Sequence, residues 1–317
     1  MKRFIIFLLA AIPLFSRAQT HNDSVWREVK LPEVTVKVRP IEQNGDTIKY
    51  NVSSFKDKED HYLEDVLKKL PGIEVGENGT ISYKGNSINH FNIEGQDLLG
   101  NRYNQATRNL PVDAVAQVQI MENDQPIRAL KNRIPSERAT LNIKLKREYK
   151  LKPFGEAQGG IGFSDNTLWD NHITLINIAK KNQTLITVKM NDTGENISEN
   201  TLDHINVANL DNYIPLPDNI ITTSSATYLP IQLKRYLMNK SYSMGINHLH
   251  RIGRYGNFRT NLIYYGTSDL LADSTSSLYG GSPTLSLNES NRRKSHEHTF
   301  VPQFRYELNA PKIYLTD

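Results

Sequence analysis

Cysteine is absent from the 317 residues of this chain. Disulfide bonds, thiolate nucleophiles and cysteine-ligated zinc are therefore excluded. The sequence also lacks a glycine-rich phosphate loop, a serine nucleophile elbow and the HExxH metalloprotease motif. Beyond the N-terminal segment, no stretch is apolar for 18 residues, so a mature chain that enters a membrane would have to do so with strands. The sequence predicts no enzyme, no cofactor and no metal centre.

Tryptophan is scarce, with 2 residues, whereas there are 15 tyrosines. Most of the tyrosines lie at or after Tyr149. A change of this kind part-way along a chain indicates a change of environment, and the aromatic girdle at a membrane interface is one such environment. The overall composition, 38% hydrophobic and 23% charged, is too apolar for a disordered chain and too polar for a helical membrane protein.

The first 18 residues have the three parts of a secretory signal peptide. Lys2 and Arg3 form the basic region, residues 4–15 form an apolar run too short to span a bilayer, and residues 16–18 form a small-x-small cleavage site. Cleavage would remove three cations, Arg17 included, and no acid, so the formal net charge of +4 would fall by three to +1. The basic pI thus belongs largely to the precursor, and nucleic-acid binding loses its support.

Residues 39–148 are expected to form a small α+β domain. The clearest element is a helix over 61–70, with Asp60 as its N-cap, one apolar stripe and Pro71-Gly72 at its end. A second short helix is expected over 112–116. Short strands are expected over residues 47–52, 73–75, 80–84, 88–93, 118–120 and 139–146.

Residues 149–317 have a different pattern, strands with one apolar and one polar face. Examples are residues 154–163, 185–190, 242–249, 258–265 and 300–308. Some connections are short, as at residues 253–256, and two polar stretches, 191–232 and 268–298, are long enough for extended loops. This alternation is typical of an outer-membrane barrel, but a soluble β-sandwich has the same period with its apolar face inward. The face of the strands that is buried decides between them.

Several polar clusters are interpreted without a functional role. Glu94, Asp97, Glu122 and Asp124 are expected to be solvated turn residues rather than paired catalytic carboxylates. Two His-x-His pairs, at 248–250 and 296–298, place two imidazoles on one strand face and are expected to lie at the surface or at the base of loops, with a metal site as the alternative. The basic run at 292–294 is interpreted as a charged loop, with contact to anionic headgroups as the alternative.

Five stretches between residues 31 and 147, in this order and behind a signal peptide, resemble the plug domain of TonB-dependent outer-membrane receptors, especially the Bacteroidetes-type form. They are LPEVTV (31–36), LEDVLKKLPGIEV (63–75), the pair GTISYKG (79–85) and FNIEG (91–95), NLPVDAV through IME (109–122), and TLNIKL (140–145). The resemblance covers a little over a third of the chain. It implies an α+β plug domain over 39–148, followed over 149–317 by the antiparallel β strands of a transmembrane β-barrel.

The resemblance also implies partners and a location. Residues 19–38 would be a mobile periplasmic segment in which Glu33, Val34, Thr35 and Val36 pair with TonB, because an extended β-branched segment is suited to strand addition. Uptake of a ligand such as a siderophore or a glycan, contact with outer-membrane lipid and a surface lipoprotein partner would follow; peptide and cobalamin stay equally open, and no ligand-binding residue can be named.

The length of the second part limits the barrel. A plugged barrel of this family has about 22 strands, whereas 169 residues (149–317) provide about six to eight at about 10 residues each. The chain is therefore expected to be a truncated receptor with an incomplete barrel. The alternative function is a secreted, soluble periplasmic binding protein in which a plug-like domain is joined to a β-sandwich.

Overall fold

The computed structural model describes residues 39–131, 133–150, 152–163, 166–195, 197, 204, 235–281 and 285–317. The chain divides into two units, residues 1–37 and residues 38–317. The predicted signal peptide and the predicted TonB-pairing residues 33–36 thus lie outside the described residues. The second unit contains every element described below.

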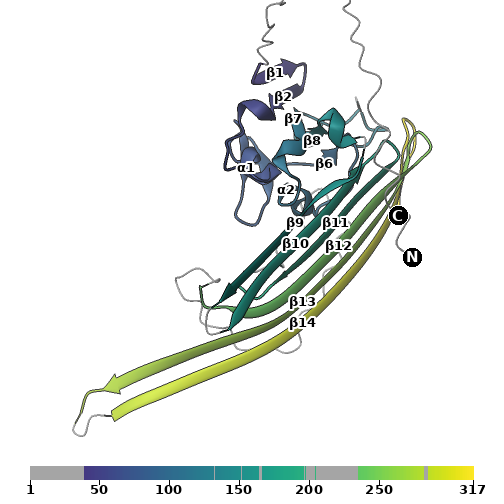
Figure 1. Ribbon diagram of the computed structural model, residues 1–317. Helices are drawn as coiled ribbons and strands as arrows, with labels where there is room; N and C mark the ends of the chain where they lie inside the picture. Colours follow the sequence, from purple (N-terminus) through teal and green to yellow (C-terminus); the bar gives the residue numbers. More distant parts are fainter. Residues whose placement is uncertain are drawn as a thin grey trace, which may run out of the picture. The chain divides into compact units, whose positions relative to one another are not determined.

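The first part of this unit is an α+β domain with two small sheets (Figure 1). Its five-stranded sheet has the order β1-β2-β7-β8-β6, antiparallel except for the parallel pair β6–β8, and its three-stranded sheet has the order β3-β4-β5. The strands are β1 (Ile41–Asn44), β2 (Thr47–Asn51), β3 (Ile73–Val75), β4 (Ile81–Tyr83), β5 (Asn86–Ser87), β6 (Phe91–Ile93), β7 (Val115–Met121) and β8 (Thr140–Leu145).

The helices of this domain are short. They are α1 (Leu63–Leu67), α2 (Asn104–Thr107) and the 3-10 turns η1 (Val52–Ser54), η2 (Val112–Ala114) and η3 (Arg147–Lys150). The apolar stripe predicted for the first helix is confirmed, since its four side chains are at most 2% exposed: Leu63, Val66, Leu67 and Leu70.

Three details of the prediction were wrong. Asp60 is not the N-cap of α1: its carboxylate accepts from the backbone N–H of Asp57 and from Lys69 Nζ, and Asp65 instead accepts from the backbone N–H of Tyr62 (3.0 Å). The second helix is only the 3-10 turn η2, because β7 begins at Val115 and takes that residue into the sheet. The helix α2 was not predicted at all.

The second part is one antiparallel sheet whose strands follow one another in chain order. It contains β9 (Phe154–Phe163), β10 (Thr167–Ile178), β11 (Asn182–Asn191), β12 (Met238–Ile252), β13 (Gly256–Tyr279), β14 (Leu285–Asn309) and β15 (Tyr314–Thr316). The described residues thus provide seven strands in an open sheet, within the predicted range. An α+β domain followed by antiparallel strands is confirmed as the fold class.

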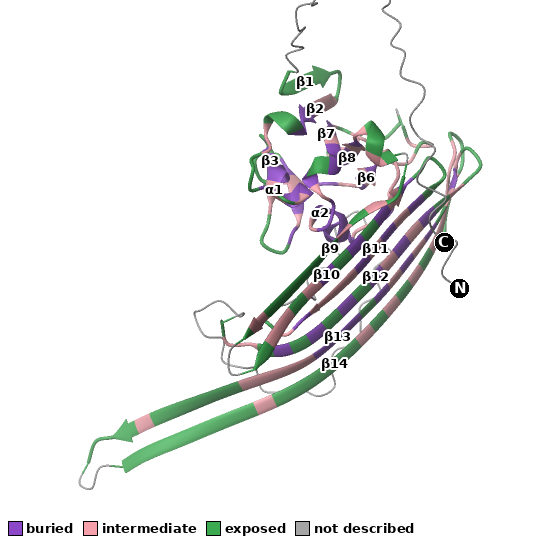
Figure 2. Ribbon diagram, viewed as in Figure 1, coloured by how far each residue is buried: buried purple, intermediate pink, exposed green. Residues whose placement is uncertain are grey.

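The stretch predicted to be a polar loop at 268–298 is instead strand. β13 and β14 stay paired without a register shift from Gly256↔Leu308 to Tyr279↔Leu285 and continue past the ends of their neighbours (Figure 1). Figure 2 shows that this far part of the hairpin is exposed, whereas buried residues gather in the α+β domain and on the parts of the strands next to it. Within the described ranges, no helix has the length and apolar character needed to cross a bilayer.

Candidate functional site

The sheet buries its polar face and exposes its apolar face. On β12 and β13, Asn247 and Asn261 are at most 1% exposed, whereas Met244 is 41% exposed and Tyr264 is 38% exposed. On β14, Phe300 is 64% exposed. Because side chains alternate along a strand, a row toward the α+β domain alternates with a row away from it. The inward rows hold polar residues and, next to the domain, the buried apolar residues Ile176, Leu185 and Leu249.

The outward-facing apolar side chains of neighbouring strands, some exposed and some half-buried, lie in common rows. One row runs through Ile173, Val188, Met244, Tyr264 and Phe300, which are successive cross-strand partners. The adjacent row holds the partners Leu175, Ile186, Ile246 and Leu262. We define the apolar belt as these two rows together with Phe304. An exposed patch of this extent is rare on a soluble monomer and marks an interaction surface.

Aromatic side chains flank the belt along the strands. Toward the long connection between β11 and β12, the rings of Trp169 and Tyr242 lie 5.9 Å apart. Toward the turn between β12 and β13, Phe258 and Tyr306 are cross-strand partners. From Tyr242 to Ile252 the strand rises about 33 Å, or about 25 Å in height at a tilt of about 40°. The outward positions of this span hold Met244 and Ile246 followed by His248 and His250.

Neutral amides form hydrogen bonds between the inward face and the α+β domain, beside the apolar residues Ile176, Leu185 and Leu249, which pack into the buried core of the domain. Asn247 Nδ2 donates to Gln105 Oε1 of α2 (2.6 Å), and Asn261 Nδ2 donates to the backbone carbonyl of Leu98 (3.2 Å). The two asparagines are also joined to each other (2.7 Å). Gly245 makes room for this contact, since a Cβ there would lie 2.6 Å from Gln105 Oε1.

One ion pair crosses the same interface. Arg259 of β13, which is 6% exposed, lies 2.9 Å from Asp97 Oδ2 and also donates to the Asp97 backbone carbonyl (3.1 Å). Asp97 further accepts from the backbone N–H of Gly100 (2.7 Å) and contacts His90 Nδ1 (3.2 Å). Burial alone would raise the pKa of Asp97, but the charge of Arg259 and the contact with His90 lower it well below its usual range. Asp97 is therefore not the solvated turn residue that the sequence predicted.

Tyr62, just before α1, connects the domain to β9. Its hydroxyl donates to Glu156 Oε1 (3.0 Å). Burial, followed by the hydrogen bond to Glu156, raises the pKa of Tyr62 to about 12. The phenol is therefore protonated, and a donor, over the whole physiological range.

Replacing Tyr62 with phenylalanine is expected to remove this donor and to destabilise the contact by about 1.5–3 kcal/mol, the usual value of a hydrogen bond to a charged group. A group whose folded pKa is raised stabilises the protein fully below its unfolded pKa, about 10 for tyrosine, and loses that contribution as pH rises toward 12. The thermal midpoint of the wild type should therefore fall more steeply than that of Tyr62→Phe between about pH 10 and 12. Parallel curves would contradict the assignment.

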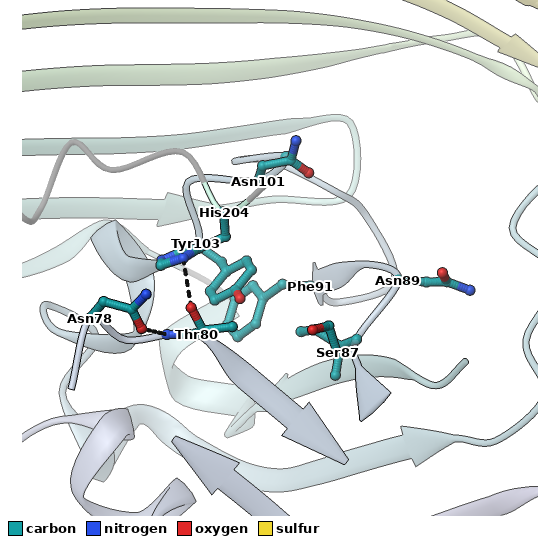
Figure 3. A pocket seen from close by; sticks show the side chains of 10 residues that line it. Asn78, Thr80, Ser87, Asn89, Phe91, Asn101, Tyr103 and His204 are labelled. Atoms are coloured by element: carbon teal, nitrogen blue, oxygen red, sulfur yellow. Dashed lines mark hydrogen bonds between the residues drawn. The ribbon is translucent and has the colours of Figure 1, made fainter. Parts of the chain in front are cut away.

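Two hollows lie beside this interface. The smaller, about 260 Å³, is shown in Figure 3. His204 Nδ1 lies 3.1 Å from Thr80 Oγ1, and its ring stacks on Tyr103 at 4.7 Å. A residue of the connection between β11 and β12 is thus docked on the α+β domain. The cavity is smaller than most sites for drug-sized ligands.

The larger hollow, about 1370 Å³, lies between loops of the domain and the strands β12–β15. Cationic side chains outnumber carboxylates in its lining. The cations are Arg102, Arg128, Lys131, Arg138, Arg251, Arg254, Arg259 and Arg305, and the carboxylates are Glu94, Asp97, Asp124, Glu137 and Glu307.

The other polar clusters have structural partners. His248 Nδ1 contacts Thr184 Oγ1 (2.9 Å), and His298 Nδ1 contacts the Tyr264 hydroxyl (3.0 Å). Glu122 accepts from the Tyr83 hydroxyl (2.8 Å). Among the described residues, no three His, Asp or Glu side chains are grouped closely enough to hold a metal ion.

Sequence patterns missed the residues that meet at this interface. The strand alternation predicted that Asn247, Arg259 and Asn261 lie on a polar face, but it did not predict which part of the chain this face contacts. Gln105 and Asp97 belong to segments with no periodicity. The one signal was Arg259, the single charged residue in the predicted strand 258–265, whose other residues are apolar or neutral polar. A charge in such a position can indicate a buried ion pair.

Comparison with known proteins gives matches among solved structures alone, since neither a family model nor a curated protein matches the sequence. One match is a mutant ferric enterobactin receptor of Pseudomonas aeruginosa, PfeA, with 10% identity over 84% of this chain and 47% of that chain, at a TM-score of 0.31. The siderophore receptor PirA of Acinetobacter baumannii is 12% identical over 84% of this chain and 46% of that chain, at a TM-score of 0.29. The alcaligin receptor FauA of Bordetella pertussis is 11% identical, with 85% and 60% covered and a TM-score of 0.28.

These neighbours are TonB-dependent outer-membrane receptors. The chain spans less than half the length of the PfeA and PirA chains. At this identity and TM-score the matches add no weight to a functional assignment, which rests on the two faces of the sheet.

Proposed function

We propose that this chain is a component of an outer-membrane receptor of the TonB-dependent type, with residues 39–148 as the plug domain and β9–β15 as barrel strands against it. The observation that carries the proposal is the orientation of the sheet. Its buried residues, such as Asn247, Asn261 and Arg259, meet the plug domain, and its apolar belt faces away from it. Such an outward apolar belt is stable when lipid surrounds it.

The alternative, a soluble binding protein with a β-sandwich, requires the opposite orientation. A sandwich buries the apolar residues of each strand between its sheets and exposes the polar ones. Here Asn261 is 1% exposed and Phe300 is 64% exposed. The exposed apolar face therefore favours the membrane protein.

The mechanism follows from the family resemblance. Residues 33–36 would pair with TonB by strand addition, and force on that segment would loosen the plug and release a ligand inward. The Bacteroidetes-type assignment and a surface lipoprotein partner rest on the sequence motifs alone. The cation-rich lining of the larger hollow favours an anionic ligand, such as a siderophore or an acidic glycan.

Location is the direct test of this proposal. Native cells are fractionated and probed with an antibody raised against residues 31–148. We expect the antigen to float with the outer membrane in a density gradient and to stay there after carbonate washing. Recovery of the antigen in the soluble periplasmic fraction would overturn the proposal in favour of the binding protein.

Pairing with TonB is tested separately. Replacing Val34 and Val36 with proline removes backbone donors and should abolish crosslinking to TonB and ligand uptake, with loss of about tenfold or more. Proline at two positions of the preceding polar segment, Asp23 and Ser24, is the matched control and should leave crosslinking intact. Equal crosslinking of both variants would show that residues 33–36 do not contact TonB.

A further inference from the structure

The β13–β14 hairpin continues the outward face of the sheet beyond the apolar belt. Pairing is unbroken, so the side chains that follow Tyr264 and Phe300 at every second position stay on that face. The next rows are Tyr242–Gly266–His298, Lys240–Ser268–His296, Met238–Leu270–Lys294 and Ala272–Arg292. Within about four rows of the belt, this face gains three permanent cations.

We define the basic rim as Lys240, Lys294 and Arg292. All three side chains are exposed. Lys294 and Arg292 are two residues apart on β14, a separation of about 7 Å, and Lys240 lies about 12 Å from Lys294, two strands and one row away. His296 and His298 share the face. From Met238 to Leu278 and from Ser286 to His298, the outward positions of these described strands hold no carboxylate.

The opposite face of the same hairpin has the reverse character. Between Thr267 and Glu297 its positions include Asp269, Asp273, Glu289 and Glu297, with Arg293 as the one cation among the described residues there; Arg259 and Arg305 lie on the same face nearer the α+β domain. Side chains on opposite faces of a strand do not meet, so these carboxylates cannot neutralise the basic rim. In a solvated loop, no interaction would place the cations on one face and the carboxylates on the other. The sorting indicates that the outward face meets an anion.

We propose that the basic rim binds the phosphate groups of lipid headgroups at the outer edge of the apolar belt. This inference rests on the proposed function, because it requires the belt to lie in lipid. Continuity favours a lipid over a free anion: Met238 and Leu270 extend the apolar surface into the row of Lys294. Each row adds about 5 Å of height at the tilt of a barrel strand, which places Lys240 and Lys294 about 10–15 Å above the Met244–Phe300 row. The flexible aliphatic chains of lysine and arginine can span the remaining distance between the strand backbone and the headgroup phosphates.

The experiment uses the full chain reconstituted in phosphatidylcholine vesicles. Because the chain has no cysteine, one introduced cysteine takes a fluorophore at a single position. Leu262→Cys labels the belt and Ala272→Cys labels the basic rim beside Arg292. Nitroxides deep in the lipid acyl chains report burial of the belt label. Phosphatidic acid and phosphatidylcholine that each carry a nitroxide near the top of one acyl chain, at equal mole fraction, report headgroup preference at the rim.

We expect the rim label to be quenched about threefold or more by phosphatidic acid relative to phosphatidylcholine, since each cation near an anionic surface adds attraction. Neutralising the rim, with Lys240→Gln, Arg292→Gln and Lys294→Gln, should bring the ratio close to one. The matched control removes the same charge at the short turns of the same sheet, with Lys180→Gln, Lys181→Gln and Lys312→Gln, and should keep the preference. Unchanged quenching of the belt label shows that each variant is still inserted.

The two proposals fail in different ways. A belt label that acyl-chain nitroxides do not quench overturns the membrane assignment, and the rim proposal with it. A quenched belt label with no headgroup preference at the rim, or with a preference that survives neutralisation, overturns the rim proposal alone. Loss of the preference on adding inorganic phosphate at constant ionic strength would assign the rim to free phosphate and likewise overturn the lipid proposal.

Discussion

Replacing Ile246 with arginine is expected to lower the amount of protein assembled in the outer membrane by at least about 30-fold. Ile246 lies in the middle of the apolar belt, between its cross-strand partners Ile186 and Leu262. An arginine at the midplane of a lipid-facing barrel strand costs about 2–4 kcal/mol, and about 1.4 kcal/mol is a factor of ten. The measurement is a quantitative immunoblot of the outer-membrane fraction at matched expression.

The control is Ser276→Arg. Ser276 lies on the same outward face but in the exposed far part of the hairpin, where its partner is Asn288. Arginine there should leave assembly unchanged, since the side chain stays in water. In a soluble protein both positions are surface positions, and neither change would have a large effect. Equal recovery of the two variants would therefore refute a lipid-facing belt.

Replacing Arg259 with glutamine is expected to destabilise the plug–sheet interface by about 3–5 kcal/mol, the cost of leaving a buried charge without its partner. Asp97 would keep its negative charge, because its side chain is 20% exposed and the backbone N–H of Gly100 still holds it. Hydrogen exchange should be faster in Arg259→Gln than in the wild type for the backbone amides around residues 95–105. Exchange in β2 and β7, away from this contact, should change less.

Two controls separate the ion pair from a general loss of charge. Arg254→Gln removes an exposed arginine of the neighbouring turn and should leave exchange unchanged. The double variant Arg259→Gln with Asp97→Asn removes both charges and should recover part of the loss. Because the folded pKa of Asp97 is lowered, its contribution is complete above the ordinary pKa of an aspartate and is lost only as pH falls toward the lowered value. A wild type that loses the interface at pH 5 would contradict the ion pair.

Local patterns predicted the elements with a strong period. The stripe Leu63, Val66, Leu67 and Leu70 predicted a buried helical turn, and the Pro71-Gly72 stop is explained by Gly72, which has φ +79°. The helix α2 (Asn104–Thr107) had no such signal: three of its four residues are polar, yet all four are buried. Tertiary contacts hold that turn in place, since Gln105 Oε1 accepts from Asn247 of β12 and Asn109 Nδ2 donates to the backbone carbonyl of Gln105.

The alternation along β13 and β14 was read as strand only where apolar residues made it visible. Between Ser268 and His298 the residues are mostly polar on both faces, and a polar sequence of this kind is also typical of a loop. Strand pairing there continues from the hydrophobic part of the same hairpin, which sets the register. The functional contacts were beyond prediction for another reason: Asp97 and Arg259 are 162 residues apart in the chain.

The amide contacts at Gln105, Asn247 and Asn261 bear on how the α+β domain would separate from the sheet under the proposed function. A hydrogen bond between neutral groups contributes only about 0.5–1.5 kcal/mol in water, because each partner exchanges it for one with the solvent. An apolar interface of the same size would resist separation through the cost of hydrating its surface. Water that enters at the amides can replace their hydrogen bonds one at a time, and the amides can pair again afterwards, whereas Ile176, Leu185 and Leu249, which pack on the core of the domain, resist hydration.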